Sequence, residues 1–241
     1  MRKVVIVVFA LGLCLASPAT ALVGETGEDA GLGAHVAMLL RRANGRSSFC
    51  TAVVVSRRAL LTSAHCVGAP SDMRLYAPAA SGGALLEVVQ ATRHPGYRAD
   101  AIASRRPSVD LAVIEMRDDL PEALTPVELA EAEHDTLGET FSVAGFGVTD
   151  EARANSGGRL SSLRLQLRAP LSSVLLWLVA LHPPGGACEG DSGAPVFDAQ
   201  NRLVGIVAYA EGAKGAHCGA LTQAVRLAPW RAFLDGVLRR R

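Results

Sequence analysis

The stretch CEGDSGAP at residues 188–195 decides the interpretation of this chain. Its Gly, Asp and Ser all favour turns, so by itself the stretch could be no more than a turn. Two other segments carry complementary chemistry. LLTSAHC at residues 60–66 follows an apolar run with His65, and VDLAVI at residues 109–114 places Asp110 before another apolar run. Each segment alone has an ordinary structural explanation, but together they offer a nucleophile, a base and an orienting carboxylate.

The chemistry of these side chains assigns a role to each. A serine hydroxyl is a poor nucleophile near neutral pH, so Ser192 needs a base within hydrogen-bond reach. Neutral His65 can accept this proton and later hand it to a leaving amine. Asp110 would fix the tautomer of the imidazole and stabilise the imidazolium. Gly190 and Ser192 would direct backbone N–H groups at the developing oxyanion.

Together the three segments resemble the trypsin/chymotrypsin-like serine proteases. His65 lies in a T-x-A-H-C-like setting, Asp110 opens a D-[IL]-A-like strand, and Ser192 lies in G-D-S-G-x-P. The order His, Asp, Ser along the chain is also the order of this family. The similarity covers the whole chain after residue 21. Further landmarks that resemble the family are HPGY at residues 94–97, AGFG at residues 144–147 and a terminal helix around Trp230.

The resemblance implies an all-β fold of two packed antiparallel Greek-key β-barrels with a C-terminal helix. We expect residues 22–241 to form one peptidase domain, with an N-terminal barrel (22–135), a C-terminal barrel (136–226) and a helix (227–241). The implied activity is that of a secreted, bacterial serine endopeptidase that works through an acyl-enzyme. The alternative is a catalytically silent protease-fold binding protein. An unrelated esterase would show a G-x-S-x-G motif, which is absent around Ser192.

Apolar patterning agrees with a mostly β chain. Apolar runs at residues 35–40 and 49–55 flank Asn44-Gly45, a strong hairpin signal because both residues tolerate positive φ. Residues 171–181 are strongly apolar and could form a strand or a helix. After Pro229, apolar residues at helical spacing predict a C-terminal helix. Further strands are expected at residues 85–91, 111–116, 141–144, 160–167, 194–197 and 203–209.

Residues 1–21 are typical of a cleavable secretory signal. They combine a positive start, an apolar run too short for a membrane span and an Ala-x-Ala ending at Ala21. We therefore expect a secreted protein, extracellular or periplasmic. Cys14 is lost with the signal, and an even number of cysteines in an exported chain favours disulfides over metal binding. The resemblance pairs Cys50 with Cys66 and Cys188 with Cys218.

The resemblance also implies a role for Asp191. In the family, the residue before the nucleophile pairs with a new N-terminal amine, and this pairing organises the oxyanion hole. Residues 22–25 (LVGE) follow Ala21 and resemble the start of active family members. We expect signal removal itself to expose the amine of Leu22. Cleavage after Ala16 would instead leave a short propeptide for another protease.

The resemblance places the floor of the substrate pocket at Gly186, where a trypsin-like enzyme would carry Asp. Specificity for substrates with Arg or Lys at P1 is therefore not expected. Thr222 falls where a bulkier residue shortens the pocket, so we expect a small or medium apolar P1 side chain. His217, next to Cys218, leaves open a preference for an acidic P1 side chain. The full set of expected pocket residues is Gly186, Glu189, Ala208, Tyr209, Ala210 and Thr222.

Three positions depart from the family pattern. Ala194 replaces the second Gly of G-D-S-G-G-P. Thr51-Ala52 stands where two glycines often follow the first Cys. Ala208 lies where a Ser commonly helps to hold the catalytic Asp, so Asp110 would have one donor fewer. None of these changes removes a residue of the triad.

Composition narrows the other classes of function. With 24 Lys+Arg against 23 Asp+Glu, the chain lacks the basic excess of a nucleic-acid-binding protein. With 49% hydrophobic and 20% charged residues, it has the material for a core and is not disordered. No further apolar run is long enough for a membrane span. We expect a monomer without metal or cofactor, whose partners are polypeptide substrates and protein protease inhibitors.

Overall fold

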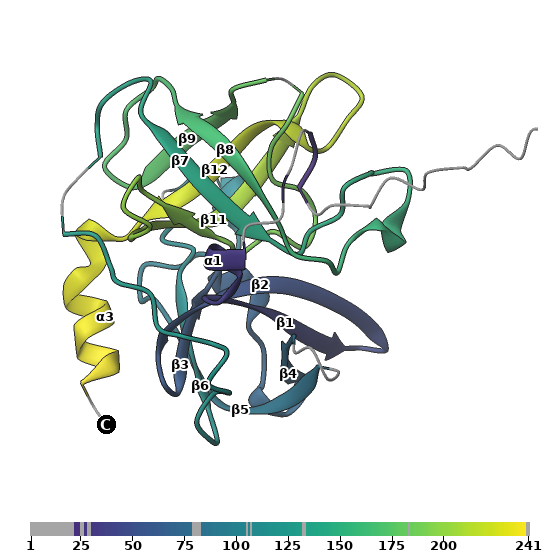
Figure 1. The fold of residues 1–241 in the computed structure, drawn as a ribbon, viewed down its shortest axis with the longest axis vertical. Coiled ribbons are helices and arrows are strands. Elements are labelled where there is room, and N and C mark those ends of the chain that lie inside the picture. The colour runs from purple at the N-terminus through teal and green to yellow at the C-terminus, as the bar shows by residue number, and fades with distance from the viewer. Residues whose placement is uncertain are drawn as a thin grey trace, which may run out of the picture.

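A computed structural model of the 241-residue chain describes residues 22–24, 27, 30–78, 83–104, 106, 108–131, 134–182 and 184–239. The expected signal segment, residues 1–21, lies outside the described residues. The strands form two closed antiparallel barrels packed against each other (Figure 1). This architecture confirms the expected all-β fold. The exact boundaries between the expected halves stay a prediction.

The first barrel closes in the order β1-β2-β3-β6-β5-β4 (Figure 1). Its first hairpin turns at Asn44 and Gly45, whose φ angles are 52° and 74°. They connect the paired residues Ala43 and Arg46, so the two-residue turn predicted from Asn-Gly is confirmed. The strands are β1 (Val36–Ala43), β2 (Arg46–Ser56), β3 (Ala59–Thr62), β4 (Met73–Ala77), β5 (Ala84–Arg93) and β6 (Ala112–Met116).

The second barrel closes in the order β10-β11-β12-β9-β8-β7. The ambiguous apolar segment forms strand β9, in which buried and half-buried residues alternate. Apolar side chains on both faces of this strand hide its period of two in the sequence. The strands are β7 (Thr140–Gly145), β8 (Ser161–Leu167), β9 (Leu175–Ala180), β10 (Pro195–Phe197), β11 (Leu203–Gly212) and β12 (Gly219–Arg226).

The sequence patterning does not predict three of these strands. Strand β3 is buried along its whole length and shows no alternation, and β4 alternates over only five residues, which include Arg74. Strand β12 begins with Gly219 and carries Thr222 and Gln223 at its centre, so it lacks a clear apolar alternation. Its identity as a strand comes from pairing with β9 and β11.

A buried cluster joins the two barrels to the C-terminal helix α3 (Arg231–Leu238). The helix follows the 3₁₀ turn η4 (Ala228–Trp230), which contains Pro229, and this confirms the predicted terminal helix. The ring of His94, from the first barrel, packs edge-on against Trp230 and Phe233 at 4.7 Å between centroids. The helix therefore fastens the end of the second barrel to the first (Figure 1).

The remaining helical elements are short. In the part of the chain that the structure describes, no helix has the length and apolar character needed to cross a membrane. The short elements are α1 (Ala30–Gly33), α2 (Ala101–Ser104), η1 (Ala64–Cys66), η2 (Pro70–Asp72) and η3 (Ala154–Ser156).

Candidate active site

Strand pairing in the first barrel brings His65 and Asp110 together. Thr62, at the end of β3, pairs with Ala112, at the start of β6. His65 follows this pair by three residues and Asp110 precedes it by two, so both leave the same edge of the barrel. The backbone N–H of His65 donates to Asp110 Oδ1 at 2.9 Å, and His65 Nδ1 lies 2.6 Å from Asp110 Oδ2.

These contacts fix the imidazole in one orientation. The Asp110 side chain is 16% exposed and that of His65 is 37% exposed, so the ring reaches solvent while the carboxylate is largely covered. Because Nδ1 faces the carboxylate, Nε2 is the ring nitrogen available for proton exchange. Ala208 has no side-chain donor for Asp110, and both contacts that the structure gives this carboxylate come from His65.

The second barrel supplies Ser192 on a tight turn before β10. The turn is held by hydrogen bonds from the Ala194 N–H to the Asp191 carbonyl at 2.9 Å and from the Gly193 N–H to the Val207 carbonyl at 2.7 Å. Gly193 has φ +87°, and a Cβ there would overlap Thr51 of the first barrel. Only glycine permits this close approach of the two barrels.

Two hydrogen bonds cross between the barrels beside the site, one from β2 to the nucleophile turn and one from the segment before His65 to β11. The Thr51 N–H donates to the Ser192 carbonyl at 2.8 Å, and Ser63 Oγ donates to the Val207 carbonyl at 2.6 Å. The Sγ of Cys66, the residue after His65, lies 3.8 Å from the Ser192 carbonyl oxygen, so the segments that carry His65 and Ser192 are neighbours at the barrel interface. The structure gives no hydrogen bond between the Ser192 hydroxyl and the imidazole. Such catalytic bonds are often long before substrate binds.

Gly190 adopts a backbone conformation that other residue types rarely reach. Its φ is +94°, and an added Cβ would overlap the ring of Phe49. The Glu189 carbonyl accepts the Val148 N–H at 2.8 Å. Because the C=O and N–H of a trans peptide point in opposite directions, the Gly190 N–H points away from Val148. This N–H is left available on the nucleophile turn, two residues before Ser192.

Asp191 is fully buried. Its carboxylate accepts the Gly147 N–H at 2.8 Å and the Cys188 N–H at 2.9 Å. Burial raises the pKa of Asp191 to about 7, and these two hydrogen bonds oppose the rise. Among the described residues, the structure gives this carboxylate no cationic partner. Side chains on Gly145 or Gly147 would overlap its oxygens, so glycines make the room that it occupies.

The start of the described chain lies beside the same region. Leu22 is fully buried and belongs to the core cluster of the second barrel, which includes Ala187 and Ala194. The backbone of Val23 exchanges two hydrogen bonds with Gly186, at 3.1 and 2.9 Å. Residues 22 and 23 are therefore packed next to the expected substrate pocket.

The structure brings several of the expected pocket residues together. Thr222 is fully buried, and its Oγ1 accepts the Ala187 N–H at 2.9 Å. A Cβ added to Gly186 would lie 3.0 Å from the same Oγ1, so the Thr222 hydroxyl occupies space beside the expected floor. On the adjacent strand, Ala210 pairs with Thr222. Tyr209 is 43% exposed.

Both expected disulfides are present, Cys50–Cys66 and Cys188–Cys218. The first links β2 to the residue after His65, and the second links the nucleophile turn to the segment before β12. Each disulfide also lies in a group of side chains close enough to share a metal ion, one with His65 and the other with Glu151. Disulfide sulfur offers no thiolate, so neither group fits a metal.

Two contacts at the site have no counterpart in the sequence analysis. The exposed carboxylate of Glu151 accepts the backbone N–H groups of His217 and Cys218, at 2.8 and 2.6 Å. It thereby joins the loop after β7 to the loop before β12. The buried hydroxyl of Thr51 donates to the Gly190 carbonyl at 2.9 Å. In the sequence, Thr51 stands out only because the family often has glycine at this position. No sequence signal predicts the contact of Glu151 with the loop before β12.

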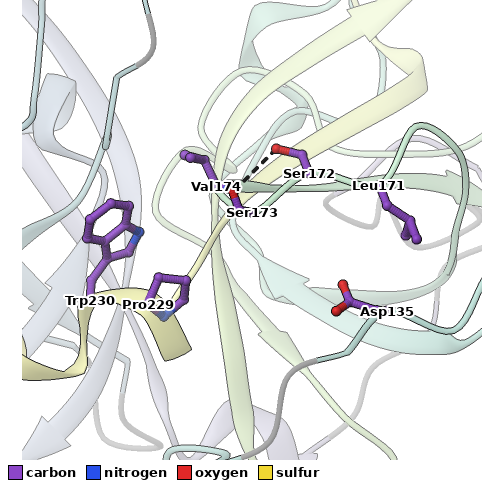
Figure 2. A pocket seen from close by; sticks show the side chains of 7 residues that line it. All are labelled: Asp135, Leu171, Ser172, Ser173, Val174, Pro229 and Trp230. Atoms are coloured by element: carbon purple, nitrogen blue, oxygen red, sulfur yellow. Dashed lines mark hydrogen bonds between the residues drawn. The ribbon is translucent and has the colours of Figure 1, made fainter.

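A separate pocket of about 590 Å³ lies beside the C-terminal helix (Figure 2). None of the expected site residues lines it. Its one carboxylate, Asp135, is paired with Arg226 at 2.7 Å. The lining residues are Asp135, Leu171, Ser172, Ser173, Val174, Pro229 and Trp230. The pocket therefore offers no nucleophile–base pair and is not the candidate active site.

Comparison with known proteins agrees with the fold. Trypsin epsilon of Drosophila erecta is 25% identical over 185 residues, which cover 69% of each chain. Granzyme M of Rattus norvegicus is 25% identical over 224 residues, which cover 82% of each chain. These relatives are animal proteins and do not support the expected bacterial source.

Solved structures share the fold at lower sequence identity. Mouse neuropsin, a serine protease, superposes with a TM-score of 0.72 at 17% identity, over 89% of this chain and 99% of that chain. Human heparin binding protein superposes with a TM-score of 0.72 at 19% identity, over 91% and 97%. The model of the trypsin family matches residues 23–231. The chain therefore belongs to the trypsin family of serine proteases.

Proposed function

We propose that this chain is a secreted serine endopeptidase whose catalytic triad is Ser192, His65 and Asp110. The observation that carries the proposal is the double contact of Asp110 with the backbone and ring of His65, at the point where Thr51 holds the Ser192 turn. Proteases of the trypsin family act on polypeptides. The division into residues 22–135, 136–226 and 227–241 is part of the proposal.

In the acylation step, Ser192 Oγ attacks the scissile carbonyl carbon while His65 Nε2 takes the hydroxyl proton. The carbonyl π electrons move to oxygen, and the N–H groups of Gly190 and Ser192 donate to this oxyanion. Asp110 stabilises the imidazolium that forms. The tetrahedral intermediate collapses, the C–N bond breaks, and His65 gives its proton to the leaving amine.

Deacylation repeats the sequence with water as the nucleophile. His65 removes a proton from the water, the oxygen of which attacks the ester carbon of the acyl-enzyme. The same two N–H groups stabilise the second oxyanion. When this intermediate collapses, Ser192 Oγ leaves and recovers its proton from His65, and the carboxylic acid product departs.

The proposed P1 side chain is small or medium and apolar. Gly186 supplies no carboxylate to pair with a basic side chain, and Thr222 fills space beside it. Tyr209 and Ala210 would form one wall, Ala208 would lie at its start, and the exposed Glu189 would stand at the mouth.

Signal removal is the proposed activation step. Cleavage after Ala21 would convert the peptide nitrogen of Leu22, whose side chain packs in one cluster with Ala187 and Ala194, into an amine near the turn of Asp191, which is fully buried and has no cationic partner among the described residues. An ammonium partner would favour the ionised form of a carboxylate whose pKa burial has raised to about 7. The pair would then lock the turn that carries Gly190 and Ser192.

Peptide-library cleavage tests this function. Wild-type protein beginning at Leu22 should cleave after small or medium apolar residues, with the products identified by mass spectrometry. Ser192→Ala should lower turnover by roughly 10⁴–10⁶-fold because it removes the attacking oxygen. Wild-type protein without turnover on any peptide, or a Ser192→Ala variant with a normal rate, would refute the proposal.

A further inference from the structure

The hydroxyl of Thr51 connects the first barrel to the turn that carries the nucleophile. Thr51 lies on β2 and is fully buried. Its Oγ1 donates to the Gly190 carbonyl at 2.9 Å and accepts the Phe146 N–H at 3.2 Å. Its backbone N–H donates to the Ser192 carbonyl at 2.8 Å. All three partners belong to the second half of the chain, so one residue makes three bonds across the barrel interface.

These bonds bracket the peptide unit that carries the Ser192 N–H. The Gly190 carbonyl belongs to the peptide unit before it, and the Ser192 carbonyl belongs to the unit after it. Thr51 holds the units on either side, and the intervening unit is itself held by the Ala194 N–H, which donates to the Asp191 carbonyl at 2.9 Å. On the other side, the Glu189 carbonyl is held by the Val148 N–H, which fixes the unit carrying the Gly190 N–H.

Thr51 is itself anchored to the rigid part of the first barrel. Its carbonyl accepts Thr62 Oγ1 at 2.7 Å, and Thr62 is the last residue of β3. The neighbouring Cys50 is bonded to Cys66, which follows His65. The strands that position His65 therefore also position Thr51 and, through it, the nucleophile turn.

A hydroxyl is the group that this position requires. It donates to the Gly190 carbonyl and accepts from the Phe146 N–H at the same time, which an apolar side chain of equal shape cannot do. Gly190, at φ +94°, has more backbone freedom than any other residue type would have there. The Thr51 bond to its carbonyl limits that freedom, together with the hydrogen bond from the Asp191 N–H of the same peptide unit to the Cys188 carbonyl at 3.1 Å.

We propose that Thr51 is a positioning residue that holds the N–H groups of Gly190 and Ser192 in place for the oxyanion. The inference rests on the proposed function and deepens it. Thr51 does not touch the substrate. Its loss should leave ground-state binding intact and weaken the stabilisation of charge in the transition state.

The test compares Thr51→Val with Thr51→Ser in a chain that begins at Leu22. Removing a whole oxyanion donor costs roughly 10²–10³ in kcat, and loosening the donors should cost less. We expect Thr51→Val to lower kcat by roughly 10–100-fold with KM within about twofold of wild type. Thr51→Ser retains the hydroxyl and should keep kcat within about threefold.

Binding of a peptide aldehyde gives a readout that a purely structural role would not change. The aldehyde forms a tetrahedral adduct with Ser192 whose oxygen needs the same donors as the transition state. Its inhibition constant should rise in Thr51→Val by the same factor by which kcat/KM falls. The inhibition constant of a non-covalent product peptide should stay unchanged.

Ser161→Ala is the control for loss of a buried hydroxyl, because Ser161 is equally buried but lies on β8 and contacts neither Thr51 nor the nucleophile turn in any hydrogen bond that the structure gives. It should keep most of kcat. If Thr51→Val fails to fold, Thr51→Ala removes the same hydroxyl with a smaller side chain and takes its place in the comparison.

Unchanged kcat in the hydroxyl-free variant would overturn the inference, as would equal losses in Thr51→Ser or Ser161→Ala. In each case wild-type turnover would leave the proposed function standing. Absence of turnover in wild-type protein would instead overturn the proposed function, and the role of Thr51 with it.

Discussion

The two halves of the candidate site are held in place by different means. His65 and Asp110 contact each other directly, from positions that the β3–β6 register already aligns. The turn that carries Gly190 and Ser192 is instead rich in glycine and is held by groups outside it, among them Thr51 and Val148. The base half is thus complete within its own barrel, whereas the nucleophile half depends on contacts from the rest of the chain.

The largest effect on the base half is expected from Asp110→Asn. The amide preserves the size of the side chain but presents an N–H to His65 Nδ1 in place of an acceptor, which favours the wrong tautomer. We expect kcat to fall by roughly 10⁴-fold with little change in KM. Steady-state kinetics on a cleaved peptide measures this. A loss below tenfold would show that the contact of Asp110 with the ring is not what prepares the base.

On the nucleophile half, Gly190→Ala should have the next largest effect. The new Cβ would overlap the ring of Phe49, and an alanine is strained at φ +94°. Displacement of this N–H should lower kcat by roughly 10²–10³-fold. The double variant with Phe49→Ala removes the overlap with the ring but neither the strain nor the 3.0 Å approach to Gly147 Cα, and should recover only part of the loss. Full recovery, or no loss in Gly190→Ala, would contradict the requirement for glycine.

The nucleophile half also depends on a partner for the buried carboxylate of Asp191, the proposed amine of Leu22. This dependence should appear as an effect of pH on the free energy of unfolding. In a chain extended before Leu22, burial raises the pKa of Asp191 to about 7 from its ordinary 3.8. The folded state then holds this proton more tightly than the unfolded state. The stability contributed by Asp191 is therefore full below about pH 4 and is lost as pH rises to about 7.

Denaturant unfolding from pH 4 to 8 measures this contribution as the difference between wild type and Asp191→Asn. The extended chain should lose stability relative to Asp191→Asn across the window. A chain that begins at Leu22 should lose much less, because its amine favours the ionised carboxylate. Identical curves for the two chain starts would argue against pairing between Leu22 and Asp191.

The smallest effect should come from Glu151→Gln. The amide retains acceptor oxygen but loses charge, so its bonds to the N–H groups of His217 and Cys218 should weaken. We expect KM to rise by roughly two- to fivefold, because the loop before β12 borders the proposed pocket, with kcat nearly unchanged. A fall in kcat at constant KM would place Glu151 with the nucleophile turn instead.

Local sequence signals account for one part of this molecule well. The Asn44-Gly45 turn and the helix after Pro229 are predicted from residue types with specific local preferences, and both are confirmed. The family and the pairing of the two disulfides are implied by the resemblance of the three motif segments, and both are confirmed.

Contacts between distant segments account for what the sequence does not predict. Strand β12 has a weak apolar pattern and is a strand because β9 and β11 pair with it. The Thr51 hydroxyl meets the Gly190 carbonyl across 139 positions, and Glu151 meets Cys218 across 67. No periodicity in either segment carries information about its partner. Such contacts follow from the packing of the two barrels.

Intact-mass spectrometry before and after a fluorophosphonate probe tests the central claim most directly. The probe phosphonylates an activated serine only when a base and an oxyanion hole are both in place. We predict one adduct on Ser192, on a chain that begins at Leu22, and none in Ser192→Ala. A folded chain beginning at Leu22 that takes no adduct, or takes one at another serine, would contradict the proposed active site.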